Sequence, residues 1–285
     1  VYLVRSALTV RPLAARGAAR YVGSVKCRPC HAKAWEAWQG SHHAKAMAAA
    51  TDQTVLGDFR DAVFEGDGIR ARFYKKGRTF CVEMEGPDGR PAEFEIRYTF
   101  GFYPLQQYLV PFPGGRFQCL SVAWDSRDKK WFFLYPGQRI PPGDWLHWTR
   151  QAANWNSMCA ECHSTGVRKR YDPASETYST TWTDINVGCE TCHGPGSRHV
   201  EWAAQPAMAR PPADNFELAV RTRGLTNREL VDLCAFCHSR RASLGDFDPA
   251  ARLLDNEMPE LLREGMYYPD GQILEEVYEY GSVTQ

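Results

Sequence analysis

Four copies of one short motif constrain this chain more than any other feature. Eight of its ten cysteines fall in pairs separated by two residues, and a histidine follows each pair directly. The copies are motif 1 (residues 27–31), motif 2 (159–163), motif 3 (189–193) and motif 4 (234–238). Chance would place about 0.01 such motifs in a chain of this composition. The fold must therefore accommodate four copies of this motif and whatever group each copy binds.

The spacing within each motif suits the covalent attachment of haem. Two thiols three positions apart can add to two vinyl groups of one porphyrin, and the histidine that follows then reaches the iron as its proximal ligand. We therefore predict four covalently attached haem c groups. The predicted thioether residues are Cys27, Cys30, Cys159, Cys162, Cys189, Cys192, Cys234 and Cys237, and the predicted proximal ligands are His31, His163, His193 and His238.

Three other uses of paired cysteines explain the pattern less well. A zinc ribbon could use the four cysteines of motifs 2 and 3, but it gives no reason for a histidine after every pair. A thioredoxin-like redox motif normally occurs once, near a βαβ pattern. A disulfide within one pair would close a very short loop and stabilise little.

Each haem iron can take a sixth ligand, and the four remaining histidines are the candidates. His199 follows His193 by six residues, and a Gly-Pro-Gly turn between them directs it toward a neighbouring haem rather than its own. His147 lies between Leu146 and Trp148 with further tryptophans nearby, a setting that suits a haem edge as well as an ordinary core. We predict both as distal ligands.

His42 and His43 are adjacent, so their side chains diverge and we expect only one of them to bind iron. Eleven residues after His31, His42 would return to nearly the same face of an unbroken helix. Gly40 and Ser41 favour a break there, with Ser41 as the N-cap of a second, alanine-rich helix. If one histidine is spare, three distal histidines serve four haems. One iron then uses another ligand or stays open to a small molecule.

The spacing of the motifs predicts an α+β fold. We expect short helices and loops around four haems, and a β-rich insert between motifs 1 and 2. The expected segments are an N-terminal arm or leader remnant (1–20), a first haem-binding segment (21–58), the insert (59–140) and a segment that binds three haems (141–285). Alternating apolar and polar residues predict about six strands within 68–136. Cys81 and Cys119 fall there and are predicted as buried thiols, with a disulfide between them as the alternative.

Short helices are predicted around 145–163, 183–193, 197–206 and 226–240, and a turn or small hairpin within 168–183. Thr226 and Glu229 have the spacing of a capping box, which places the start of the last helix.

Charge and hydropathy exclude two classes of partner. Lys+Arg and Asp+Glu both number 34, which argues against a nucleic-acid footprint. No run of 18 apolar residues is present, so we predict no transmembrane segment. Haem is joined to such motifs outside the cytoplasm in bacteria. Because residues 1–20 make a poor signal peptide, we expect a periplasmic or extracytoplasmic protein whose export signal lies upstream of this chain.

Three stretches carry a family resemblance: "YVGSVKCRPCHAKAWEAWQGSHHAKAM", "NWNSMCAECHSTG" and "NVGCETCHGPGSRHV". They resemble the multihaem cytochrome c554-type family, and most closely its bacterial members with a tetratricopeptide-repeat region downstream. The family pattern W-x-x-S-x-H-A coincides here with Trp38, Ser41, His43 and Ala44, so the resemblance favours His43 over His42. It also implies electron transfer through closely packed, mostly bis-histidine haems, with redox proteins as partners. Members continue with a further motif and helical repeats.

The leading hypothesis is electron transfer by a tetrahaem domain, without catalytic residues. One alternative is a reductase or oxidase that acts on a small nitrogen or sulfur compound at a five-coordinate haem. The other is a docking module for a redox partner within a larger repeat-containing protein. We favour a carrier over a catalyst.

Overall fold

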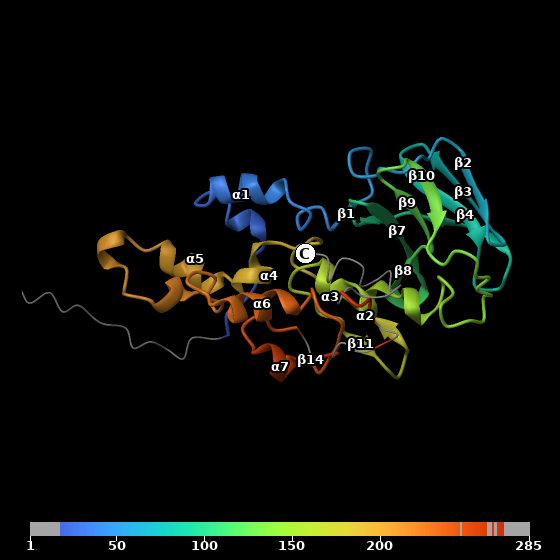
Figure 1. Ribbon diagram of the computed structural model, residues 1–285. Helices are drawn as coiled ribbons and strands as arrows, with labels where there is room; N and C mark the ends of the chain where they lie inside the picture. Colours follow the sequence, from blue (N-terminus) through green and yellow to red (C-terminus); the bar gives the residue numbers. More distant parts are fainter. Residues whose placement is uncertain (1–17, 246, 261–263, 265–266, 271–285) are drawn as a thin grey trace, which may run out of the picture.

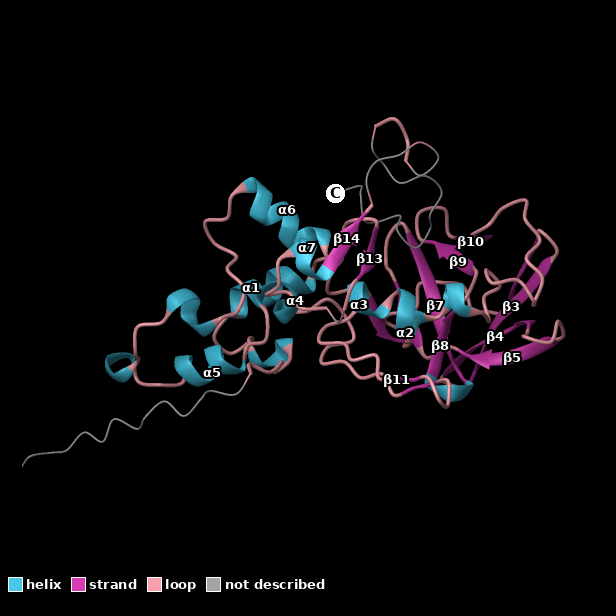
Figure 2. Ribbon diagram, turned by 90° about the horizontal axis from the view of Figure 1, so that it is seen from below, coloured by secondary structure: helices cyan, strands magenta, loops and turns pink. Residues whose placement is uncertain are grey.

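Antiparallel sheets form one side of the molecule, and short helices and loops form the other (Figures 1 and 2). The computed structural model describes residues 18–245, 247–260, 264 and 267–270. Motif 2 lies where the two sides meet, whereas motifs 1, 3 and 4 lie among the helices. No helix in these described ranges is long and apolar enough to cross a membrane.

Ten strands lie between motifs 1 and 2 and form two antiparallel sheets. One sheet has the order β2-β3-β4-β5; the other has the order β1-β6-β7-β9-β10, with β8 paired to β7. The bounds are β1 Met47–Ala49, β2 Ala62–Gly66, β3 Ile69–Lys76, β4 Thr79–Glu85, β5 Pro91–Glu95, β6 Tyr98–Phe100, β7 Leu105–Phe112, β8 Arg116–Cys119, β9 Val122–Asp125 and β10 Lys130–Phe133.

An aromatic core joins the two sheets. On β3, Ala71 and Phe73 are fully buried while the intervening arginine is not, which is the alternation expected of a strand covered on one face. Phe73 stacks on Trp131 with ring centroids 3.5 Å apart. Trp148, also buried, packs edge-on against Phe94 and Phe112. These large rings bury the apolar area that stabilises this half of the chain without a cofactor.

Two details of the predicted strand region differ in the structure. Residues 68–136 contain eight strands, β3 to β10, rather than about six. The alanine-rich helix after Ser41 is wrong: residues 42–46 form turns, and β1 follows them and pairs with β6. Met47 is buried in that pairing, and the Ala46 carbonyl accepts a hydrogen bond from the Gly101 backbone N–H. Tertiary pairing overrides the helix propensity of alanine here.

Cys81 and Cys119 are buried free thiols, as predicted. Cys81 belongs to β4 of the four-stranded sheet and Cys119 to β8 of the other, so the alternative of a disulfide between them is wrong. Burial raises the pKa of both thiols.

The helices are short, and each predicted helical range contains one or more of them. Their bounds are α1 Ala32–Gln39, α2 Trp155–Met158, α3 Ala160–His163, α4 Cys189–His193, α5 Ser197–Ala203, α6 Asn227–Ala235 and α7 Leu253–Asn256. A small hairpin joins β11 Tyr171–Asp172 to β12 Thr177–Tyr178, and β13 Arg241–Ser243 pairs antiparallel with β14 Glu257–Pro259 across a connection that contains α7. The capping box of Thr226 and Glu229 is confirmed at the start of α6.

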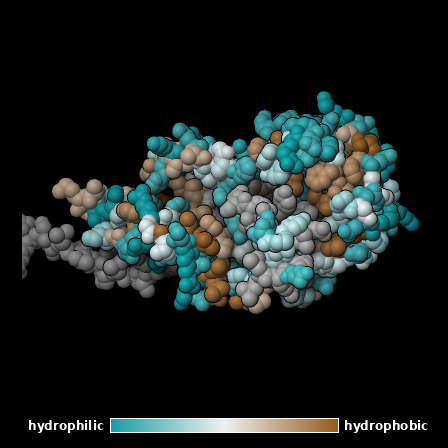
Figure 3. Space-filling model, in the orientation of Figure 1, coloured by the Kyte–Doolittle hydropathy of each residue, from teal (hydrophilic) through white to brown (hydrophobic). Residues whose placement is uncertain are grey.

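The helices around the motifs are poorly covered by protein. Neither α1 nor α5 buries a residue, although α1 carries two tryptophans. On α6, Leu230 and Val231 are 52% and 64% exposed, and Figure 3 shows apolar side chains gathered over this helix. Protein packing therefore holds the sheets together, whereas these helices have apolar surface available for a cofactor.

Candidate haem-binding centres

In each motif, a tight turn places both thiols and the histidine within one short segment. The backbone N–H of His31 donates to the Cys27 carbonyl at 2.9 Å, and His163 and His238 make the equivalent bond at 3.2 and 2.9 Å. Motif 1 leads into α1, motif 2 contains α3, motif 3 forms α4, and α6 ends within motif 4. One turn of this kind brings two cysteines to the same side of the backbone.

Cysteines of different motifs lie beside one another in space. A hydrogen bond between the Cys27 and Cys189 thiols lowers the pKa of Cys189 to about 6 and raises that of Cys27. A bond with Cys237 likewise lowers the pKa of Cys162 to about 7. Burial, and after it the nearby Cys234, raises the pKa of Cys192. The neighbouring motifs are therefore 1 and 3, 3 and 4, and 4 and 2.

This arrangement argues against the zinc ribbon. Such a site needs the four cysteines of motifs 2 and 3 around one ion. Motif 2 instead meets motif 4, and the described ranges contain no group of three or more His, Cys, Asp or Glu side chains that could hold a single metal ion.

Two histidine pairs have the separation expected across an iron. The ring centroids of His31 and His199 are 6.1 Å apart, and those of His43 and His238 are 6.0 Å apart. An imidazole nitrogen binds a transition metal at about 2 Å, with its ring centre about 1 Å further away, so two imidazoles on one metal have centres about 6 Å apart. Each pair joins a motif histidine to one of the candidate distal ligands. The residues present thus fit a haem between them.

His163 and His193 have different surroundings. The Phe100 ring lies 4.3 Å from the His163 ring, and the Thr222 hydroxyl lies 3.3 Å from Nδ1 of His193. Burial lowers the pKa of His163 to about 4 and also lowers that of His193. Both rings are therefore neutral near pH 7, which is the form that ligates a metal.

The structure separates the adjacent His42 and His43. His42 contacts the rings of Phe102 and Tyr103, each with centroids 6.1 Å away, while His43 faces His238. Of the two, His43 is the one beside a motif histidine.

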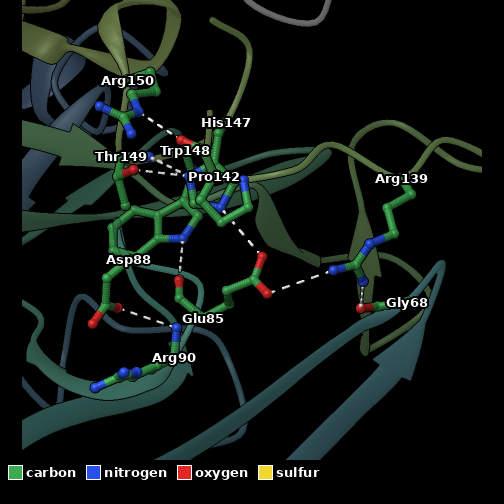
Figure 4. A network of polar contacts seen from close by, with 10 residues as sticks. All are labelled: Gly68, Glu85, Asp88, Arg90, Arg139, Pro142, His147, Trp148, Thr149 and Arg150. Atoms are coloured by element: carbon green, nitrogen blue, oxygen red, sulfur yellow. Dashed lines mark hydrogen bonds and ion pairs between the residues drawn. The ribbon is translucent and has the colours of Figure 1, made fainter. Parts of the chain in front are cut away.

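His147 lies in the core of the sheets, away from its predicted role. Its Nδ1 is 2.8 Å from the Thr149 hydroxyl and its Nε2 is 3.7 Å from the Glu85 carboxylate (Figure 4). The indole N–H of Trp148 donates to the Glu85 carbonyl at 2.8 Å. Burial, and after it the charge of Arg150, lowers the pKa of His147 to about 4, outweighing the opposite effect of Asp144. These contacts tie the loop after β10 to the end of β4, and sequence reasoning did not anticipate them.

The turn that carries His43 is held by the segment before motif 3. The indole N–H of Trp38 donates to the Val187 carbonyl at 2.9 Å, and the Val187 N–H donates to the His43 carbonyl at 3.2 Å. The Asn186 side chain donates to the Ala44 carbonyl at 2.7 Å. The tryptophan and alanine of the family pattern thus position the histidine between them.

Sequence reasoning missed three polar residues near the motifs. Glu190, between the cysteines of motif 3, is 2% exposed and accepts backbone hydrogen bonds. Asp184 accepts two bonds from Ser24, whose hydroxyl also accepts from the Cys189 N–H. Arg241 donates to the Cys162 sulfur at 3.3 Å. The sequence signal for Glu190 was its position between the two cysteines of motif 3. A carboxylate in such a crowded segment needs hydrogen-bond donors nearby.

Paired thiols, facing histidines and uncovered apolar helices are together the features expected of a c-type haem protein. Residues 26–58 and 146–194 match the family model described as cytochrome c554 and c-prime. These segments contain motifs 1, 2 and 3, and they confirm the resemblance to the multihaem cytochrome c554-type proteins.

One solved structure is similar over most of the chain. The crystal structure of the outer cell wall cytochrome OcwA aligns with a TM-score of 0.55 and 18% sequence identity, over 89% of this chain and 48% of that one. This chain therefore spans about half the length of that cytochrome, and the likeness is one of fold. No curated protein matches the sequence.

Proposed function

We propose that this chain is an electron-transfer segment that holds four covalent haem c groups. The observation that carries the proposal is the pair of histidine–histidine separations near 6 Å, each joining a motif histidine to a histidine from a distant segment. Haem c supplies an iron that alternates between Fe(III) and Fe(II), with a potential set by its axial ligands and surroundings. His31 with His199, and His238 with His43, are the two proposed axial pairs.

The chain's own residues hold these groups in a row. The neighbouring thiols of motifs 1 and 3, 3 and 4, and 4 and 2 support a spatial order of motif 1, motif 3, motif 4, motif 2, which differs from the order in the sequence. Such a row suits the passage of single electrons between redox protein partners at its two ends. Its covalent haem attachment supports an extracytoplasmic location.

Haem content and spin state test the proposal. The full chain is produced with a c-type haem maturation system and purified. We expect four covalent haems per chain by haem-stained denaturing gel and intact mass, and low-spin signals typical of bis-histidine iron. Fewer than four covalent haems would contradict the count, and the absence of bis-histidine signals would contradict the axial pairs.

A second candidate function is a reductase or oxidase at motif 2. His42 and His147 contact groups other than the motif histidines, so the eight histidines provide only two pairs. A cavity of about 50 Å³ adjoins Cys159 and is lined by Phe100, the ring neighbour of His163. An open iron there would bind CO or nitrite. Because two pairs leave two of the four haems without a distal histidine, binding of CO or nitrite to at least one of those two would favour this function, and a fully low-spin, CO-inert protein would exclude it.

A further inference from the structure

Glu190 is a buried carboxylate whose donors are all backbone N–H groups. It lies between the cysteines of motif 3 and is 2% exposed. Val22 donates to both of its oxygens at 2.9 and 3.0 Å, Gly23 donates at 2.7 Å, and Gly196 donates at 2.7 Å. An ionised carboxylate only accepts hydrogen bonds, so this set of donors satisfies it and offsets its burial.

The donors come from two segments that lead to different ligands of one haem. Val22 and Gly23 directly precede the turn into motif 1, which carries His31. Gly196 is the N-cap of α5, which carries His199. Glu190 therefore joins two segments more than 170 residues apart in the sequence, at the place where each turns toward its histidine.

Hydrogen bonds along its length place α5, and the one to Glu190 lies at its N-cap. The helix buries no residue, so core packing does not fix it. Its other contacts include reciprocal bonds between Arg20 and Ser197, at 2.9 and 3.1 Å, and a bond of 2.8 Å between His199 Nδ1 and the Phe216 carbonyl. At its C-terminal end, the Trp202 indole N–H donates to the Pro211 carbonyl and Arg210 donates to the Ala203 carbonyl, each at 2.8 Å. The bond to Phe216 sets the orientation of the ring and leaves Nε2 for a metal. It does not set the distance from His31.

We propose that Glu190 is the positioning residue for axial ligation of the haem held by motif 1. By binding both segments, it sets the separation at which His31 and His199 face each other. This inference rests on the proposed function, because it requires these two histidines to share one iron. Glu190 acts on the ligands through the backbone.

The change Glu190→Gln disturbs this arrangement without changing side-chain size. An amide has one acceptor oxygen and one NH₂ donor, so one side of the group would point a donor at N–H groups that need an acceptor. Either the motif 1 segment or the start of α5 must then move away. We expect His199 to leave the iron and one haem in four to become high-spin.

Three variants of the haem-loaded full chain make the test. Glu190→Gln is compared with His199→Ala, which removes the ligand itself, and with Glu201→Gln, which changes an exposed carboxylate on the same helix. Haem content should remain four per chain in all of them. Electron paramagnetic resonance should show one new high-spin haem in E190Q and H199A and none in E201Q. Added imidazole should restore the low-spin signal in both, because it can occupy the vacated position.

The outcomes separate this inference from the function on which it rests. If H199A gains a high-spin haem and E190Q does not, the role of Glu190 is refuted and the axial pair stands. If H199A gains no high-spin haem relative to the parent protein, the pair itself is refuted, and the inference with it. Should E190Q fail to accumulate, Glu190→Asp replaces it: the charge remains, but the shorter side chain cannot reach both segments. A wild-type spectrum in E190D would then overturn the proposal.

Discussion

Replacing His42 and His43 separately by alanine distinguishes two neighbours that the sequence alone leaves nearly equivalent. Only His43 has its ring 6.0 Å from that of His238, whereas His42 contacts Phe102 and Tyr103. We expect His43→Ala to remove one axial ligand and His42→Ala to remove none. The two variants are matched in size, position and charge, so each is the control for the other.

The size of the effect follows from the number of haems and from the backbone contacts. One of four haems should lose its sixth ligand, so a quarter of the haem should change from low-spin to high-spin. The fold should survive, because the segment before motif 3 holds this turn through the backbone carbonyls of His43 and Ala44, which an alanine retains. We expect the free energy of unfolding to change by about 0.5 kcal/mol or less before the loss of the iron–histidine bond is counted.

Carbon monoxide titration of the reduced protein measures the vacated position directly. His43→Ala should bind about one more CO per chain than the parent protein, as expected for one vacated axial site. His42→Ala should bind the same amount as the parent. The reasoning is refuted if the two variants exchange these results, or if His43→Ala binds no additional CO at four haems per chain.

The remaining predictions concern residues outside the axial pairs. His147→Asn should leave every haem spectrum unchanged, because the structure places this ring among the sheets. Since burial lowers its pKa from 6.5 to about 4, the unfolded chain binds a proton between these values that the folded chain does not. The free energy of unfolding should therefore fall as pH falls through this window, by up to about 3 kcal/mol, and the variant should lose that part of the slope in denaturant titrations. Thr226→Ala removes the hydroxyl that accepts from the Glu229 N–H while leaving the bond from its own backbone N–H to Glu229, and should cost about 1 kcal/mol, measured by hydrogen exchange in α6. Gly188→Ala would place Cβ 2.3 Å from the Ser24 hydroxyl oxygen and 2.5 Å from the Asp184 carboxylate, and should cost roughly 1–3 kcal/mol in thermal unfolding.

Local signals predicted much of the fold. The capping box needs only Thr226 and Glu229 three positions apart, and the structure contains it. The hairpin within 168–183 forms between β11 and β12, beside turn-favouring residues. The helix expected after Ser41 does not form, because a contact between distant segments overrides the local propensity. Its alanines have high helix propensity, but Met47 pairs with Phe100 across more than fifty residues, and that contact is invisible to local pattern.

The candidate haem-binding residues also divide into those that local sequence predicts and those that depend on contacts between distant segments. Covalent haem attachment depends on thiol spacing and on the following residue, so each C-x-x-C-H motif could be recognised from the sequence. The distal side depends on which segments meet. His147 lies near aromatic residues in the sequence and folds into the core of the sheets, while His199 lies beside the histidine of motif 1. Glu190 needed both of its partner segments in place before its role could be inferred.

The sequence by itself predicted the chemistry proposed for this protein, because a haem-attachment motif is encoded within five consecutive residues. Tertiary structure alone decided which motifs are neighbours, that the His31 ring lies beside His199 and the His43 ring beside His238, and that a buried carboxylate joins the segments before His31 and His199. The physical reason is the range of each interaction. A covalent motif acts over one turn of backbone, whereas an axial pair requires two segments more than 150 residues apart to be held at about 6 Å by many weak contacts.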